Sequence, residues 1–317
     1  MARFDRATGR YVHLILSGIE YRVYFEESGT GIPLLLQHTA GADGRQWRHL
    51  LEDETITQHF RCVAYDLPCH GRSLPPVGPE WWAEEYRLTR DFLMQVPMAL
   101  AEALALRRPV FMGSSIGGHL ALDLARYHPE SFRAVIALEG AAATPGSYLD
   151  LWNHPRVSNA FKANVMYGLM SPASPKALRH ETMWVYSQGA PPVFKGDLYY
   201  HGVDHDLREE LAHIDTSRVA VFLLTGEYDW NTTPELSRST AEQIPGAVYR
   251  TMHGLGHFPM SEDPERFRGY LIPVLDAIRA SEGSELLVPR VFARRNEIRN
   301  PKFETNPKPQ KSKDQNE

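Results

Sequence analysis

Short apolar runs, separated by segments of helical periodicity, extend through most of the chain. Residues 12–16 and 20–25 are rich in β-branched and aromatic side chains and flank Ser17-Gly18-Ile19, which predicts an antiparallel hairpin at the start of a sheet. The later runs are continuously apolar, as expected for strands that are covered on both faces. These predicted strands are residues 33–37, 61–65, 110–112, 134–138, 219–225 and 247–252.

Apolar positions spaced by three and four residues predict helices between these strands. One helix follows residue 115, and a long amphipathic helix is predicted over residues 88–106, with Pro97 inside it or at a break. A closing helix is predicted over residues 263–280, kinked by Pro273. The alternation of strands and helices is typical of the α/β class and predicts a mostly parallel central sheet with helices on both faces.

Residues 143–215 interrupt this alternation, because no clear strand lies between residues 138 and 219. The segment is rich in aromatic residues and methionine, and its position in the chain predicts a helical cap inserted before the strand at 219–225. We interpret most of its apolar side chains as the cap's own small core and the others as walls of a substrate pocket.

The chain is therefore predicted to have a core made of residues 1–142 and 216–283 and a cap made of residues 143–215. Residues 284–317 form a C-terminal extension dominated, after Arg294, by Arg, Lys, Asn, Pro and Gln. Such a composition buries too little surface to fold alone, so we expect most of this extension to be disordered.

Composition narrows the function to a small-molecule enzyme or receptor. The 317 residues carry a formal net charge of -5 with both signs spread along the chain, which argues against a nucleic-acid partner, and no run of 18 apolar residues predicts a membrane span. The N-terminus lacks the apolar core of a secretory signal, so a cytoplasmic location is expected. Cys62 and Cys69 do not make a disulfide framework, and Cys69 is a candidate reactive thiol. Self-association into a homo-oligomer is left open.

The strongest chemical signal is Gly113-Ser-Ser-Ile-Gly117, which stands between an apolar run and a helical pattern. The spacing G-x-S-x-G is typical of a sharp strand-to-helix turn that holds its serine in a strained conformation, exposed to substrate. The N–H of Ile116, at the start of the helix, points to the same space, where the helix dipole favours negative charge.

A serine hydroxyl is a weak nucleophile at neutral pH and needs a base, which in turn needs an orienting anion. His257, in a glycine-bracketed loop after the last strand, is the candidate base, and we interpret His253 as structural. Asp229 follows a buried strand directly and is the candidate acid, because sites in open α/β sheets form at the carboxyl edge.

With these residues identified, the chain resembles the α/β-hydrolase fold family, in particular its capped members, over residues 20–280. The motifs that carry the resemblance are His38-Thr-Ala-Gly41, Asp66-Leu-Pro-Cys-His-Gly-Arg-Ser73, Gly113-Ser-Ser-Ile-Gly-Gly118, Gly226-Glu-Tyr-Asp229 and Gly256-His-Phe-Pro259. The resemblance implies that Ser115 is the nucleophile, His257 the general base and then acid, and Asp229 its orienting carboxylate. It also implies an oxyanion hole made of the N–H groups of Ala40 and Ile116.

Two positions depart from the usual family pattern, because Thr39 and Cys69 stand where glycines are usual. Thr39 would offer a hydroxyl to the pocket. Glu139, at the end of the strand after the elbow helix, is an alternative acid, since some lactone-cleaving members draw their acid from that position. If it is not the acid, we expect a partly buried carboxylate with a pKa raised by desolvation.

Further candidates for contact with the substrate are His38, Trp230 and Arg45. Of these, Arg45 would either meet a substrate carboxylate or cap the next helix. Asp204-His205-Asp206 suggests a metal site, but no further ligand cluster is evident and none is predicted.

The function expected is hydrolysis of a small or medium carboxylic ester, lactone or thioester through an acyl-enzyme, with no metal or organic cofactor. Serine rather than aspartate at the elbow disfavours the epoxide- and haloalkane-cleaving branches, which build an ester on a carboxylate. Two alternatives remain open: a C–C bond hydrolase of the ring-cleavage-product type, and a small-molecule receptor on the same fold.

Overall fold

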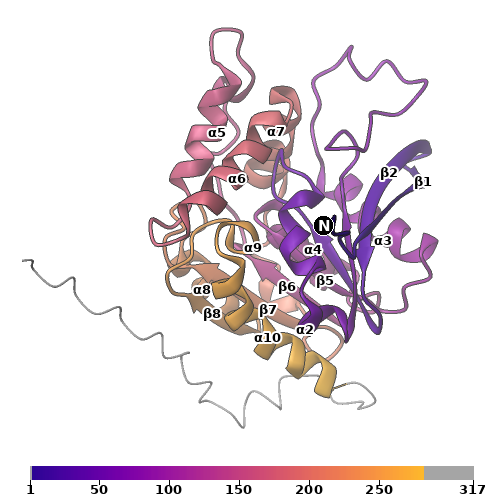
Figure 1. Cartoon of the computed structure of the whole chain (residues 1–317), viewed down its shortest axis with the longest axis vertical. Helices are drawn as coiled ribbons and strands as arrows, with labels where there is room; N and C mark the ends of the chain where they lie inside the picture. Colours follow the sequence, from indigo (N-terminus) through magenta and orange to yellow (C-terminus); the bar gives the residue numbers. More distant parts are fainter. Residues whose placement is uncertain (1, 282–317) are drawn as a thin grey trace, which may run out of the picture.

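An eight-stranded sheet runs through residues 2–281, the part of the chain that this computed structural model describes (Figure 1). Its strands lie in the order β1-β2-β4-β3-β5-β6-β7-β8. Their bounds are β1 (Thr8–Leu16), β2 (Ile19–Ser28), β3 (Ile32–Gln37), β4 (Phe60–Tyr65), β5 (Val110–Ser114), β6 (Ala134–Leu138), β7 (Ala220–Gly226) and β8 (Val248–Met252).

The strand directions follow from the connections. β1 and β2 form the predicted hairpin, in which Leu16 pairs with Ile19 across Ser17 and Gly18, both with positive φ. β2 is also antiparallel to β4, whereas all pairs from β4 to β8 are parallel. The carboxyl ends of the parallel strands therefore lie at one edge of the sheet, where their loops can build a site.

Helices cover both faces of the sheet, so β5, β6 and β7 are buried throughout and can be continuously apolar. The helices of the core are α1 (Arg48–Leu51), α2 (Glu54–Thr57), α3 (Arg90–Ala103), α4 (Ile116–Tyr127), α8 (Pro234–Glu242), α9 (Pro259–Glu262) and α10 (Pro264–Ala280), with a 3-10 turn at Gly44–Trp47. α3 packs against α4, and α1 packs against α9. This arrangement confirms the predicted fold class.

Two predicted helices differ slightly from their expected bounds. α3 begins two residues later than predicted, because the Thr89 hydroxyl accepts the N–H of Phe92 and caps the helix, and it ends before Ala105, which has a positive φ. Pro97 lies inside α3 and Pro273 inside α10. The short helices α1, α2 and α9 were not predicted.

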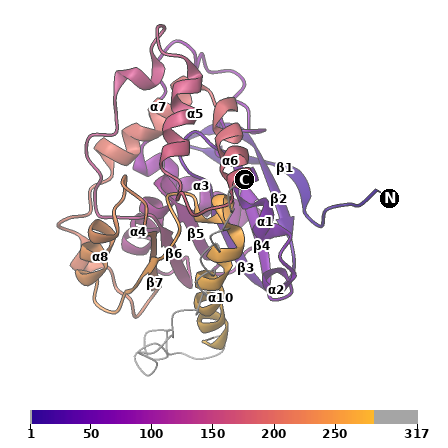
Figure 2. The same ribbon diagram turned by 60° about the vertical axis from the view of Figure 1, so that its left-hand side comes forward.

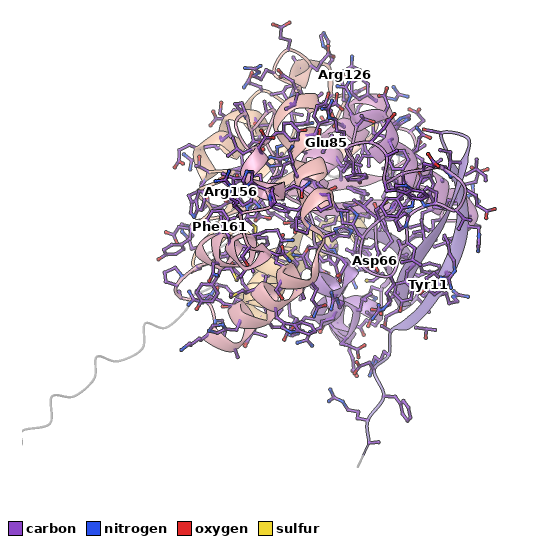
Figure 3. The ribbon with its side chains drawn as sticks, turned by 90° about the horizontal axis from the view of Figure 1, so that it is seen from above. Tyr11, Asp66, Glu85, Arg126, Arg156 and Phe161 are labelled. Carbon is purple, nitrogen blue, oxygen red and sulfur yellow. The ribbon has the colours of Figure 1, made fainter. Side chains whose placement is uncertain are left out.

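All residues between β6 and β7 are described, and none of them forms a strand. They contain α5 (Asn159–Gly168), α6 (Lys176–Gln188), α7 (Pro191–Tyr199), a π-helical turn η3 (Tyr200–Asp204) and the 3-10 turns η2 (Asp150–Asn153) and η4 (Leu211–His213). Figures 1 and 2 show α5–α7 gathered above the sheet, and from above Phe161 and Arg156 lie on the opposite side of the molecule from Tyr11 (Figure 3). We call residues 143–215 the insert.

Two sequence predictions remain outside this description. The C-terminal extension of residues 284–317 lies outside the described residues. The division into a core and a cap domain stays a prediction.

Within residues 2–281, no helix combines the length and the apolar character that a membrane crossing requires.

A buried carboxylate links the insert to the core. Asp197 of α7 is fully buried, and its Oδ2 accepts the N–H of Gly41 at 2.7 Å and lies 2.7 Å from Nε2 of His70. Burial alone would lower the pKa of His70, but the charge of Asp197 and the hydrogen bond to it outweigh burial and raise this pKa above its ordinary value. The protonated imidazole and the carboxylate therefore form a buried pair between the insert and the core loops.

This pair makes stability depend on pH. The pKa of His70 is higher in the folded chain than in the unfolded chain. The pair therefore contributes its full stability at pH values below the ordinary histidine pKa, and this contribution is lost as the pH rises through the raised value. Asp197→Asn should lower the free energy of unfolding by about 2 kcal/mol at pH 6, the order for hydrogen bonds to a charged group, and by less at pH 9. Urea denaturation at both pH values measures this. Asp206→Asn, which removes an exposed ion pair with Arg208, is the control and should change stability by under about 0.5 kcal/mol. An equal loss at both pH values would show that His70 is neutral in the fold.

Candidate functional site

Ser115 lies at the sharp turn between β5 and α4 with φ 58° and ψ -113°, a conformation that costs a non-glycine residue about 1–3 kcal/mol. Close packing on both sides requires glycine. A Cβ at Gly113 would lie 2.5 Å from the backbone of Gly117, and one at Gly118 would overlap the carbonyl oxygen of Leu138. The sequence G-x-S-x-G-G thus allows β5, α4 and β6 to approach closely enough to form the turn.

Hydrogen bonds hold the strained residue in place. The N–H of Ser115 donates to the carbonyl of Leu138 at 2.9 Å, and its own carbonyl accepts the backbone N–H of His119 at 2.9 Å. The same carbonyl lies 2.8 Å from Nδ1 of His119. Because a carbonyl only accepts, Nδ1 of His119 carries the proton. His119 was not recognised in the sequence, although its position one helical turn after Ser115 is a readable signal.

Asp229 and His257 form a buried pair at the carboxyl edge of the sheet. Oδ2 of Asp229 lies 2.6 Å from Nδ1 of His257, and Oδ1 accepts the N–H groups of Asn231 and Thr232. The carboxylate fixes the tautomer, so that Nδ1 of His257 donates and Nε2 is free to accept a proton. The N–H of His257 donates to the carbonyl of Leu169 in the insert. The pairing predicted between these two side chains is present in the geometry.

Glu139 lies behind this pair, fully buried, with φ 49° at the end of β6. Its Oε2 accepts the hydroxyl of Ser114 at 2.9 Å. Burial, and next the charge of Asp229, raise the pKa of Glu139 well above its ordinary value. The Glu139 carboxyl therefore resists ionisation more than an ordinary glutamate does, and it is Asp229 rather than Glu139 that hydrogen-bonds His257.

The loop after β3 brings Ala40 to the cavity that also contains Ser115 and His257. His38 and Thr39, offered from the sequence as substrate contacts, do not line this cavity. His38 is fully buried between the carbonyl of Thr39 and the N–H of Leu67, and burial, followed by the proximity of His70, lowers its pKa to about 4. His38 therefore holds two loops together.

Thr39 also has its polar groups occupied. Its N–H and hydroxyl lie 3.0 and 3.1 Å from Oε1 of Gln46, and the hydroxyl contacts that of Tyr186 in α6. The residue in place of the usual glycine thus joins the loop to the insert, and Tyr186 rather than Thr39 lines the cavity.

Arg45 lies away from this cavity. Its Nε and Nη2 donate to the two carboxylate oxygens of Asp43, and Nη1 donates to Gln188. It lines a separate hollow of about 380 Å³ together with Cys69. The local partner Asp43 explains why the interpretation of Arg45 as a substrate contact does not match the structure.

Cys69 does not have the properties of a reactive thiol. Burial, followed by the charge of Asp197, raises its pKa to about 12, so the thiolate is not populated at neutral pH. Its φ of 70° explains why the family pattern usually has glycine at this position.

Asp204, His205 and Asp206 do not converge on a metal. Nδ1 of His205 lies 3.0 Å from Oδ2 of Asp123, and Asp206 pairs with Arg208. The residues that the structure describes contain no group of three or more His, Cys, Asp or Glu side chains arranged to hold a metal ion.

The cavity above Ser115 has a volume of about 430 Å³ and is mainly apolar. Trp230 lines it, as predicted, with its indole N–H donating to the carbonyl of Gly168 in α5. The remaining walls come chiefly from the insert. The lining residues are Ala40, Ser115, Thr144, Pro145, Gly146, Ser147, Leu149, Trp152, Val165, Met166, Leu169, Tyr186, Phe194, Leu198, His201, Trp230, Asn231, Leu236 and His257.

Similar folds occur among solved structures. A thermophilic esterase from Thermogutta terrifontis has a TM-score of 0.71 at 23% identity, covering 85% of this chain and 99% of its own. The enol-lactonase from Burkholderia xenovorans LB400 has a TM-score of 0.72 at 20% identity, covering 84% of this chain and all of its own. At these identities the likeness shows the shared fold.

Sequence relatives are also hydrolases by name. A 2-hydroxy-6-oxononadienedioate/2-hydroxy-6-oxononatrienedioate hydrolase from Burkholderia vietnamiensis is 26% identical over 46% of this chain, which spans about half (50%) of that relative's length. The pimeloyl-[acyl-carrier protein] methyl ester esterase of Vibrio cholerae is 24% identical over 79% of this chain and 96% of its own. The model of the Alpha/beta hydrolase family matches residues 34–269. The chain therefore belongs to the alpha/beta hydrolase family.

Proposed function

We propose that this chain cleaves a small or medium carboxylic ester, lactone or thioester through an acyl-enzyme formed on Ser115. The observation that carries the proposal is the shared cavity. Ser115, in its strained turn, and His257, held by Asp229, line the same mainly apolar space. A nucleophile, an oriented base and a cavity for an organic substrate are the minimum that acyl transfer requires.

The reaction begins when Nε2 of His257 takes the proton of Ser115 as its oxygen attacks the substrate carbonyl. The imidazolium that forms is stabilised by the Asp229 carboxylate, 2.6 Å from Nδ1. His257 then gives its proton to the leaving alcohol or thiol, and the acyl group stays on Ser115. Water repeats the sequence, with His257 first accepting its proton and then returning a proton to Ser115 as the acid leaves.

The negative charge of the tetrahedral intermediate falls to the N–H groups of Ala40 and Ile116. Ile116 is the first residue of α4, so its N–H has no acceptor within the helix and lies at the positive end of the dipole. Ala40 is held by its neighbours, because Gly41 donates to Asp197 and Thr39 contacts Gln46 and Tyr186. We propose that the insert acts as the cap of the site and also holds this loop.

The cavity lining weighs against the alternative of a C–C bond hydrolase. The substrates named for the Burkholderia vietnamiensis relative are dioates, which carry two carboxylates at neutral pH. No Lys or Arg is among the described residues that line the cavity around Ser115.

A receptor function would not require Ser115 to be held in a strained conformation beside an oriented base, so turnover is the better account.

Ser115→Ala should remove most hydrolysis of p-nitrophenyl acetate and butyrate. Loss of a triad nucleophile lowers turnover by up to about 10⁶-fold. The variant is compared with wild type by release of p-nitrophenolate at constant pH. Ser114→Ala, which alters the neighbouring hydroxyl bonded to Glu139, is the matched control and should retain most activity. Equal rates in wild type and Ser115→Ala would overturn the acyl-enzyme proposal.

Asp229→Asn and Glu139→Gln separate the two candidate acids. Asparagine at 229 no longer favours the tautomer in which Nδ1 of His257 donates, so kcat should fall by about 10³- to 10⁴-fold. Burial raises the pKa of Glu139 well above its ordinary value, and glutamine can still accept the hydroxyl of Ser114, so Glu139→Gln should keep kcat within about threefold of wild type. The measurement is kcat for p-nitrophenyl butyrate. The opposite order of effects would make Glu139 the orienting acid.

A further inference from the structure

One wall of the cavity is polar although it takes no part in the proposed chemistry. Thr144 and Ser147, in the segment after β6, and His201, in the π-helical turn η3, all line the space that contains Ser115. π-helical turns often accompany functional sites, because the extra residue re-aims a side chain. Most of the other residues that line the cavity are apolar, among them Leu236.

The hydrogen bonds of this wall start at the nucleophile. Nδ1 of His119 donates to the carbonyl of Ser115, so Nε2 of the neutral ring accepts the hydroxyl proton of Thr144, 2.8 Å away. Burial, and next the proximity of His201, lower the pKa of His119 well below its ordinary value, which keeps that ring neutral. The oxygen of Thr144 then has only lone pairs left to offer His201.

His201 lines the cavity, and only one of its two ring nitrogens has a firm side-chain partner. Its Nδ1 lies 3.0 Å from the hydroxyl of Ser147. The oxygen of Thr144 lies 3.2 Å from Nδ1 and 3.3 Å from Nε2, so it cannot be in line with both nitrogens. Ser147 is therefore the firmer partner, and Nε2 is the nitrogen available to a ligand. Because Ser147 can donate or accept, His201 can present either an acceptor or an N–H.

The wall is polar without being charged. His201 is only 1% exposed, and burial, followed by the proximity of His257 and His205, lowers its pKa to about 3. No Asp, Glu, Lys or Arg is among the described residues that line the cavity. A charged substrate group would lose its water here without gaining an opposite charge, whereas a ketone or hydroxyl would gain a hydrogen bond.

We propose that His201, supported by Ser147 and Thr144, is a specificity site for an uncharged ketone or hydroxyl group in the acyl or alcohol part of the substrate. The substrate class is then a neutral oxo- or hydroxy-ester, lactone or thioester. This inference rests on the proposed function, since it assigns the substrate of the same cavity. His201 takes no part in the proton transfers and acts through substrate binding.

The kinetic test uses three p-nitrophenyl esters whose acyl chains have nearly the same size: pentanoate, 4-oxopentanoate and hemisuccinate. An alcohol-side series compares pentyl with 4-oxopentyl acetate. In one of the two series, wild type should prefer the ketone over the apolar chain by about five- to tenfold in kcat/KM, the effect of one buried neutral hydrogen bond. Hemisuccinate should be the poorest of its series.

Variants connect the preference to His201. His201→Phe keeps an aromatic ring and should abolish the ketone preference, whereas His201→Gln keeps hydrogen-bonding capacity and should retain part of it. Ser147→Ala should reduce it. Leu236→Ala, which changes an apolar residue of the cavity lining, is the control and should change the rates for ketone and apolar esters by the same factor. An unchanged preference in folded His201→Phe would overturn the proposal.

A binding measurement tests the specificity site without requiring turnover. Trp152 and Trp230 line the cavity, so quenching of their fluorescence reports occupancy. N-(4-nitrophenyl)-4-oxopentanamide should bind wild type about five- to tenfold more tightly than N-(4-nitrophenyl)pentanamide, with the corresponding acetamides as the alcohol-side pair. Equal affinity in both pairs would overturn the specificity site, while Ser115-dependent hydrolysis of p-nitrophenyl pentanoate would leave the proposed function standing. Absence of all hydrolysis with a retained binding preference would overturn only the proposed function.

Discussion

The left-handed backbone at Ser115 is the constraint on which the rest of the site depends. It needs β5, α4 and β6 in close contact, which only hydrogen in place of a side chain at Gly113 and Gly118 permits. It also needs its carbonyl and N–H satisfied, by His119 and Leu138. The strain is small beside the burial of the surrounding strands, so the sheet can hold it. The turn fixes the hydroxyl of Ser115 at the edge of the sheet where the loops after β3, β7 and β8 converge.

The insert is hydrogen-bonded to the loop that follows β3. Asp197 of α7 accepts the N–H of Gly41, and Tyr186 of α6 contacts Thr39. Ala40 lies between these two anchored residues, so the position of its N–H depends on helices that come much later in the chain. The same contacts therefore influence the shape of the cavity and the placement of the Ala40 N–H, so under the proposed mechanism changes in α6 or α7 would alter both substrate fit and the environment of the developing charge.

The sequence predicts those features whose cause is local. Continuous apolar runs predicted the parallel strands, and the turn chemistry at Gly113–Gly117 predicted the elbow, because backbone conformation there depends on neighbouring residues. Arg45 and His38 were offered as candidates for substrate contact, with helix capping as the alternative for Arg45, because their partners, Asp43 and the backbone at Leu67, become visible only once loops are placed. The polar wall at His201 was missed for the same reason. Residues 119, 144 and 201 come together only in the fold, and no short sequence motif indicates their contact.

Burial decides which of the many ionisable groups around the site carry charge. Burial and the charge of Asp229 raise the pKa of Glu139 well above its ordinary value, while desolvation and neighbouring histidines lower the pKa values of His119 and His201. The Asp229 carboxylate, in contrast, is satisfied by two N–H groups and by His257. Among the described groups that surround Ser115, His257 has one oriented carboxylate partner, and no Lys or Arg lines the cavity. Under the proposed mechanism, stabilisation of the developing charge falls to backbone dipoles, which need no proton and act over a wide pH range, and the neutral histidines would discriminate substrates by hydrogen bonding alone.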